Sequence, residues 1–191
     1  MKELKQDRKS RYTRMVLRDS LVELMKTKPI TKITIKELCE NADINRSTFY
    51  SHYSNQYDLL NSIEEETLSW AKKSISYLMD KHDIQETKNI LLEMFKSIKE
   101  NSQHLQVLMS EKGDIDFQKR LFALIYEECG INLAAGEHKD KDMNESYFVF
   151  VVNGSVGLIQ HWLKNGMTKS AEEMADIIYQ LTFAREPNEM K

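Results

Sequence analysis

The stretch that decides the fold runs from Thr34 to Leu60 and reads TIKELCENADINRSTFYSHYSNQYDLL. Thr34 is a good helix N-cap, and Glu37 three residues later completes the pattern of a capping box. Apolar residues then recur at helical spacing, which predicts a short helix over 34–41 with one buried face. Asp43 stands where the chain must turn sharply, and Asp tolerates the left-handed conformation better than most residues other than Gly.

A second short helix is expected over 45–52, directly after this turn. Asn45 is placed to cap it, and Phe49 and Tyr53 are spaced to point inward. Its outward side carries polar side chains that can form hydrogen bonds: Arg46, Ser47, Thr48, Tyr50 and His52. Two short helices joined by a tight turn form a helix-turn-helix unit, which places its second helix in the major groove of DNA.

This stretch resembles the DNA-binding motif of the tetracycline-repressor (TetR) family of bacterial transcription regulators. The matching positions are Thr34, Ile35, Leu38, Ala42, Ile44, Thr48, Phe49, Tyr50, His52 and Leu59. Three positions depart from the family pattern, because Asp43 replaces Gly, Tyr53 replaces Phe and Gln56 replaces Lys. The first two changes are physically mild. The third removes a positive charge that commonly lies near the phosphate backbone, which weakens the expectation of tight binding at high salt.

The composition agrees with an all-α protein that binds nucleic acid at one end. The chain has 191 residues, 41% of them hydrophobic, so it can bury a sizeable core in one or two small domains. It has only six Gly and two Pro, and long runs of good helix formers. Residues 1–60 hold 12 Lys and Arg against 8 Asp and Glu, whereas residues 61–191 hold 15 against 22. Positive charge is therefore concentrated where the helix-turn-helix lies.

The first eighteen residues are the most basic part of the chain. They contain Lys2, Lys5, Arg8, Lys9, Arg11, Arg14 and Arg18, against Glu3 and Asp7. For Lys2 and Lys5, a solvated end of the chain explains the charge equally well. Arg11 and Arg14 fall inside the first predicted helix, so they are better candidates for contact with phosphates.

We expect nine helices in all. Their predicted ranges are 8–26, 34–41, 45–52, about 54–80, 86–100, 102–110, 115–129, 144–165 and 170–183. The resemblance implies three N-terminal helices for DNA and a larger helical region for dimerisation and ligand sensing. We accordingly expect a helix-turn-helix domain over residues 1–54 and a dimerisation and effector-binding domain over residues 55–191, joined by the long fourth helix.

The helix predicted over 144–165 is the best candidate for a dimer interface. In the TetR family the last two long helices usually pair with their copies in a second subunit. Independently of that resemblance, this segment is apolar nearly all round and carries two glycines, each of which costs about 1 kcal/mol against Ala in a helix interior. We expect Gly154, Gly157 and Trp162 at the interface. The alternative is packing against a helix of the same chain.

The side chains expected to contact DNA lie on and around the second helix of the motif. They are Thr34, Asn45, Arg46, Ser47, Thr48, Tyr50, His52 and Gln56. A bidentate contact of Arg46 with guanine would give about 1–3 kcal/mol of discrimination, whereas the alternative is a plain surface charge. Tyr50 and His52 match family positions that touch the sugar-phosphate backbone, and for His52 the alternative is a structural hydrogen bond. A homodimer would place two such helices in successive major grooves of a pseudo-palindromic operator.

An effector pocket among the middle helices is implied by the resemblance. The candidate lining residues are Met94, Phe95, Phe122, Tyr126 and Phe150. Met forms an adaptable lining. Aromatic and Met residues at helical spacing are also typical of an ordinary core, and some family members respond to a protein partner instead.

Other classes of function find little support in the sequence. There is no Gly-rich phosphate loop, no HExxH and no recognisable nucleophile or metal-ligand cluster, so we expect no enzyme, cofactor or metal. Cys39 and Cys129 are too few and too distant to frame a disulfide fold or zinc site. No signal peptide is visible, and the apolar stretch 147–163 is shorter than the ~20 residues of a membrane span.

We therefore expect a cytoplasmic, homodimeric DNA-binding regulator, a repressor gated by a small-molecule effector. The alternative is a helical regulator that responds to a ligand or a protein, acts through a protein partner, and binds DNA weakly or not at all.

Overall fold

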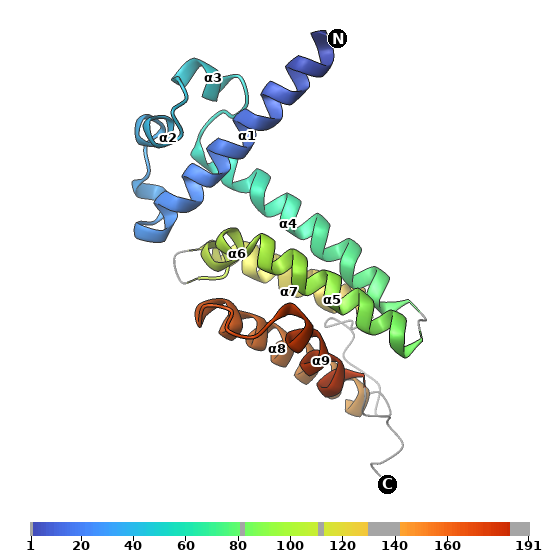
Figure 1. Ribbon diagram of the computed structural model, residues 1–191. Coiled ribbons are helices and arrows are strands. Elements are labelled where there is room, and N and C mark those ends of the chain that lie inside the picture. Colours follow the sequence, from blue (N-terminus) through green and yellow to red (C-terminus); the bar gives the residue numbers. More distant parts are fainter. Residues whose placement is uncertain (1, 81–82, 111–112, 130–141, 184–191) are drawn as a thin grey trace. The chain divides into compact units, whose positions relative to one another are not determined.

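A computed structural model describes residues 2–80, 83–110, 113–129 and 142–183, and within these ranges the chain is helical and contains no strand (Figure 1). The helices are α1 (Lys2–Thr27), α2 (Ile35–Asn41), α3 (Arg46–Tyr50), α4 (Gln56–Met79), α5 (Ile84–Glu100), α6 (Ser102–Leu108), α7 (Ile115–Glu128), α8 (Asp142–Lys164) and α9 (Ala171–Thr182), with a 3-10 turn, η1, at Ile30–Lys32. The all-α class with nine α-helices is confirmed for the described part of the chain.

The chain divides into two compact units. The first comprises Met1–Thr67 together with Val107–Phe117, and the second comprises Leu68–Gln106 together with Gln118–Lys191. The long helix α4 therefore contributes to both units.

The first unit is built around the inner face of α1. Leu17, Leu21 and Met25 on α1 are buried, as are Leu38 on α2 and Phe49 on α3. In addition, the buried Ser20 hydroxyl donates a hydrogen bond to the carbonyl of Leu38, at 3.0 Å. Burial of these side chains is what orients the two short helices, because helices of five and seven residues are not stable alone in water.

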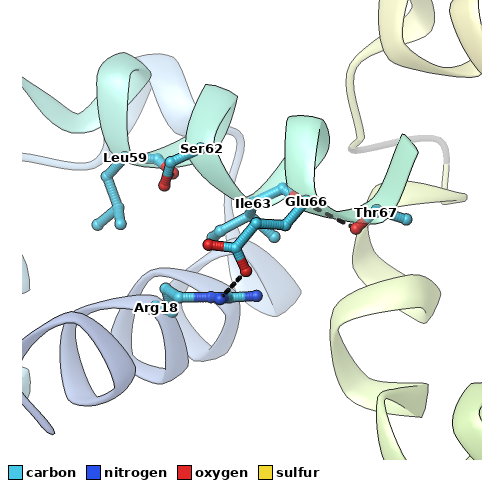
Figure 2. A network of polar contacts seen from close by, with 6 residues as sticks. All are labelled: Arg18, Leu59, Ser62, Ile63, Glu66 and Thr67. Carbon is cyan, nitrogen blue, oxygen red and sulfur yellow. Dashed lines mark hydrogen bonds and ion pairs between the residues drawn. The ribbon is translucent and has the colours of Figure 1, made fainter. Parts of the chain in front are cut away.

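An ion pair joins α1 to α4 inside this unit (Figure 2). Arg18 Nη1 contacts Glu66 Oε2, with the guanidinium lying under the carboxylate. Along the same stretch of α4, the Ser62 and Thr67 hydroxyls donate to the carbonyls of Leu59 and Ile63, at 2.7 and 2.8 Å. Arg18 is therefore engaged with α4.

The core of the second unit lies between α5 and α9, which pack along each other. Phe95 on α5 meets Trp162 on α8 edge to face, with ring centroids 5.6 Å apart. Indole Nε1 of Trp162 donates to the carbonyl of Lys169 at 3.0 Å, so the polar atom of this buried side chain is satisfied. Outside the core, Lys88 on α5 pairs with Asp176 on α9 at 3.1 Å.

Side-chain caps are present at the starts of α2, α3, α5 and α9, and the observed helix starts correct two expectations. Helix α1 begins at Lys2, six residues before the predicted start. The hydroxyl of Thr34 accepts from the backbone N–H of Glu37 at 3.2 Å, as expected, but the Glu37 carboxylate pairs with Lys28. The full capping box occurs instead at α9, where the side chains of Ser170 and Glu173 each accept a backbone N–H of the other residue.

Candidate nucleic-acid interface

The turn between α2 and α3 has the geometry that the sequence predicted. Asp43 has φ of 51°, in the left-handed region where the family pattern has Gly. The next residue, Ile44, donates its backbone N–H to the carbonyl of Cys39 at 2.9 Å, which closes the end of α2. The tight turn between α2 and α3 therefore forms although Asp43 stands where the family pattern has Gly.

Helix α3 is held at its start by Asn45. Oδ1 of this residue accepts from the Thr48 backbone N–H at 2.8 Å and from the Ser47 hydroxyl at 2.6 Å. At the other end, the Ser51 hydroxyl donates to the Thr48 carbonyl at 2.7 Å. For a helix of only five residues, these bonds satisfy a large share of the terminal backbone groups.

The predicted DNA-contacting side chains differ in exposure. Thr34, Asn45, Arg46, Ser47 and Tyr50 are exposed, whereas Thr48, His52 and Gln56 are half-buried. Those on α3 are brought together on its outer side, and Thr34 stands separately as the cap of α2.

Beneath the exposed side of α3, aromatic rings fix the orientation of the helix. Phe49 has no exposed surface, and Tyr53 is also buried. The Tyr50 ring stands edge-on against Phe49, at 5.6 Å between centroids and 84° between planes. Tyr50 therefore contacts the buried Phe49 while 57% of its own surface stays exposed.

At the start of α4, the side chain of Asn55 caps the helix. Its Oδ1 accepts from the backbone N–H groups of Tyr57 and Asp58, each at 2.9 Å, and Asp58 accepts from the N–H of Ser54 at 2.9 Å. Gln56 is the first residue of this helix. Two of the backbone donors that could meet a phosphate there are therefore already used by Asn55.

The five candidate pocket residues occupy different environments. Only Met94 lines the open groove of about 570 Å³ that α4 and α5 border in the second unit. Phe95 belongs to the core, Phe122 and Tyr126 are half-buried on α7, and Phe150 is 76% exposed on α8. The groove is lined by Trp70, Lys73, Ser74, Tyr77, Glu86, Asn89, Ile90, Glu93, Met94 and Ser97.

The three residues expected at a dimer interface also differ in exposure. Gly154 and Gly157 are exposed on α8, and within the described part of the chain a Cβ atom added to either would meet no atom within 4 Å beyond the neighbouring helix backbone. Trp162 is 3% exposed and packs in the core of its own chain, as described above. Its side chain therefore follows the alternative of packing within the chain, and the glycine pair is what remains on the surface.

The two thiols have environments that disfavour their ionised form. Burial raises the pKa of Cys39 above its usual value, although the positive charge of Arg46 opposes this effect. Burial also raises the pKa of Cys129, and Glu128 adds to the rise. Within the described ranges, no group of three His, Cys, Asp or Glu side chains is arranged to hold a metal ion. None of the described helices is both long and apolar enough to cross a membrane.

Comparison with known proteins gives a family and a fold. The chain matches the TetR-family model of a transcriptional regulator C-terminal region over residues 85–184, more than half of its length. A TetR transcriptional regulator from Streptococcus agalactiae 2603V has 18% identity and a TM-score of 0.58, covering 96% of this chain and 99% of its own. The dihydroxyacetone kinase operon activator DhaS has 19% identity and a TM-score of 0.54, covering 90% and 94%. A search of curated proteins gives no match. The family match, together with the shared all-helical fold, shows that the chain belongs to the TetR family of transcriptional regulators.

Proposed function

We propose that this protein is a homodimeric repressor that reads a pseudo-palindromic DNA operator through α3 and is released by a small-molecule effector. The observation that carries the proposal is the outer side of α3, where polar side chains are exposed on a helix that is capped at its start and anchored by a buried aromatic ring. We assign DNA binding to residues 1–54 and dimerisation and effector binding to residues 55–191. Because its target is the chromosome, we place the protein in the cytoplasm.

Arg46 is the residue that we assign to base recognition. It is the first residue of α3 and is exposed, and the N-terminal residues of a recognition helix are those that approach base edges. A guanidinium can donate two hydrogen bonds to O6 and N7 of guanine. We assign backbone contacts to Tyr50, His52 and Thr34, and a weaker polar contact to Gln56.

The exposed glycines of α8 support dimerisation through this helix. Each mid-helix Gly costs about 1 kcal/mol against Ala. Among the residues that the structure describes, nothing beyond the neighbouring backbone of α8 lies within 4 Å of a Cβ atom built at either position. A close approach by the same helix of a second subunit would explain why glycine is present at both positions. Phe150 is exposed one helical turn before Gly154, so apolar area is available next to the glycines on α8.

The groove between α4 and α5 is our candidate effector site. Trp70, Tyr77 and Met94 offer an aromatic and adaptable surface, and Lys73 and Glu93 provide charge at the edge. These residues favour a planar ligand that carries a polar group. Trp162 is the only other tryptophan and is buried, so binding in the groove should change the fluorescence of Trp70 in a Trp162→Phe variant.

Repression is the direction of control that we propose, because a dimer bound across two major grooves excludes other proteins from that DNA. DhaS, which shares the fold, is an operon activator, so the direction requires its own test. Deleting the gene should raise transcription from the operator it binds. A fall in transcription would instead identify an activator.

Operator binding by the full chain is the decisive experiment. Selection from random duplexes should give a two-fold symmetric sequence with half-sites about 34–36 Å apart, one turn of DNA. Titration of that duplex at 50–200 mM salt should show an affinity that falls steeply as salt rises. No selected sequence, or no binding at the lowest salt, would contradict the proposal and favour the alternative of a regulator that acts through a protein partner.

Two substitutions separate base recognition from backbone contact. Arg46→Ala should relax the base preference at one position of each half-site, at a cost of about 1–3 kcal/mol. Tyr50→Phe removes one hydroxyl and should weaken binding to a similar degree on all sequences. If both variants bound the operator as wild type does, the assignment of α3 to the major groove would be wrong.

A further inference from the structure

The groove between α4 and α5 uses a face of α5 that differs from the face packed on α9. Leu91, Phe95 and Ile98 of α5 belong to the core that this helix forms with α9. The lining positions on α5 recur every three or four residues and are Glu86, Asn89, Ile90, Glu93, Met94 and Ser97. They therefore form a second stripe along the helix, which borders the groove.

Tyr77 and Glu86 show how the two helices are aligned along the groove. Helices α4 and α5 run in opposite directions (Figure 1), and the Tyr77 hydroxyl lies 3.5 Å from Oε1 of Glu86. One turn back along α4 is Lys73, and one turn on along α5 is Asn89. Both residues line the groove, so they lie at the same level, about 5 Å from the level of Tyr77.

One further turn along, the groove is apolar. Trp70 lines it on α4 and Met94 lines it on α5. Trp70 is half-buried because it also packs against the core between α5 and α9, and Met94 is half-buried as well. An aromatic wall opposite an adaptable thioether suits a flat ring, held about 5 Å, one helical turn, from the level of Lys73.

The carboxylates that line the groove are engaged with other side chains, whereas the ammonium group is not. Glu93 pairs with Lys96 at 2.9 Å, and Glu86 lies against the Tyr77 hydroxyl. Within the described part of the chain, Lys73 forms no hydrogen bond or ion pair. The charge that the groove offers to a ligand is therefore positive and lies in its middle.

The amide of Asn89 adds a second donor at this level. Its Oδ1 accepts from Nε2 of Gln85 at 3.1 Å, so the amide nitrogen is the end that can donate to a ligand. Lys73 also can only donate. Two donors at one level, one of them charged, suit a carboxylate better than a cation or a neutral group.

We propose that the groove binds an aromatic monocarboxylate, with its ring between Trp70 and Met94 and its carboxylate on Lys73 and Asn89. This inference rests on the proposed effector site and names the chemical class of its ligand. A single negative charge is favoured because Glu86 lies one turn beyond Lys73, where a second anionic group would meet a carboxylate.

The test is titration calorimetry of the full chain, without DNA, against three probes that share one ring system. Naphthaleneacetate carries a carboxylate, naphthaleneacetamide is its neutral counterpart, and naphthylmethylamine is a cation at neutral pH. Naphthaleneacetate should bind about tenfold more tightly than the amide, because the amide cannot form the charged contact with Lys73. The amine should bind more weakly than either, since its charge is repelled by the same ammonium group.

Substitutions of Lys73 connect this preference to the groove. Lys73→Gln should bring the affinities for naphthaleneacetate and naphthaleneacetamide to within about twofold, whereas Lys73→Arg should keep the preference because a guanidinium retains the charge. Lys99→Gln is the matched control, because Lys99 is exposed on α5 but does not line the groove. It should leave the affinities for all three probes unchanged.

Four results would overturn the assignment. They are equal binding of naphthaleneacetate and its amide, tightest binding of the amine, an anion preference that survives in Lys73→Gln, and no binding of any probe. The calorimetry needs no DNA, so its outcome does not depend on operator binding. If naphthaleneacetate bound as expected but left the affinity for the selected operator unchanged, the ligand class would stand and the role of the groove as an effector site would fall.

Discussion

Replacing Gly157 by Leu should have opposite effects on the helix and on the dimer. Gly157 is exposed, and among the described residues a Cβ atom built there meets no atom within 4 Å beyond the neighbouring backbone of α8, so we expect the larger side chain to fit within one chain. Leu also forms helices better than Gly by about 0.8 kcal/mol, so the isolated chain should become more stable. If α8 packs closely against its copy, however, the same side chain enters the interface.

The size of the second effect follows from two-fold symmetry. Forcing extra methylene groups into a packed contact costs about 1–3 kcal/mol, and the dimer would contain the substitution twice, once in each subunit. The free energy of dimerisation should therefore weaken by about 2–6 kcal/mol. At 1.4 kcal/mol per factor of ten, this raises the dissociation constant by roughly 30-fold to 10⁴-fold.

Sedimentation equilibrium over nanomolar to micromolar protein measures this constant directly. Urea unfolding at a concentration where both proteins are monomers tests the predicted gain in stability. Lys99→Leu, an exposed position on α5, is the matched control and should leave dimerisation unchanged. A Gly157→Leu protein that dimerises with the wild-type constant would refute the assignment of α8 to the interface.

Three further substitutions and one thiol measurement test the local structure. Asp43→Gly should raise the free energy of unfolding in urea by about 0.5–1 kcal/mol. The reason is that the strain of Asp at φ of 51° exceeds the extra conformational entropy that Gly loses on folding. A lower free energy of unfolding would show that a contact favours Asp43. Asn45→Ala should cost about 1 kcal/mol and weaken operator binding, since the N-cap bond to Thr48 is lost; equal stability of the two proteins would contradict the importance of this cap. Gly113→Ala should lower the melting temperature, because its Cβ would lie 2.2 Å from the Leu108 carbonyl oxygen; a melting temperature equal to that of the wild type would contradict this close approach. Cys39 should react with Ellman's reagent at pH 8 more slowly than free cysteine, because burial shields the thiol and raises its pKa, so that less thiolate is present. In denaturant the reaction rate should rise to the free-cysteine value. A reaction equally fast in the native state would show that the α2 region opens.

The sequence alone determined the secondary structure and the helix-turn-helix, since both depend on neighbours within a few residues. The caps Thr34 and Asn45, the turn at Asp43 and the inward Phe49 are local signals, and each has the structural role that was expected. The partner of Glu37 was not predicted, because Lys28 lies outside the helix that the capping pattern describes.

Only the tertiary structure decided which apolar residues face the interior and which face the surface. In the sequence, Trp162, Phe95 and Phe150 are equivalent large apolar residues on helices. The packing of α5 against α9 buries the first two and leaves Phe150 exposed beside the glycine pair. Helical periodicity shows that a face is apolar but carries no information on which helix covers it, because that choice depends on contacts between residues far apart in the chain.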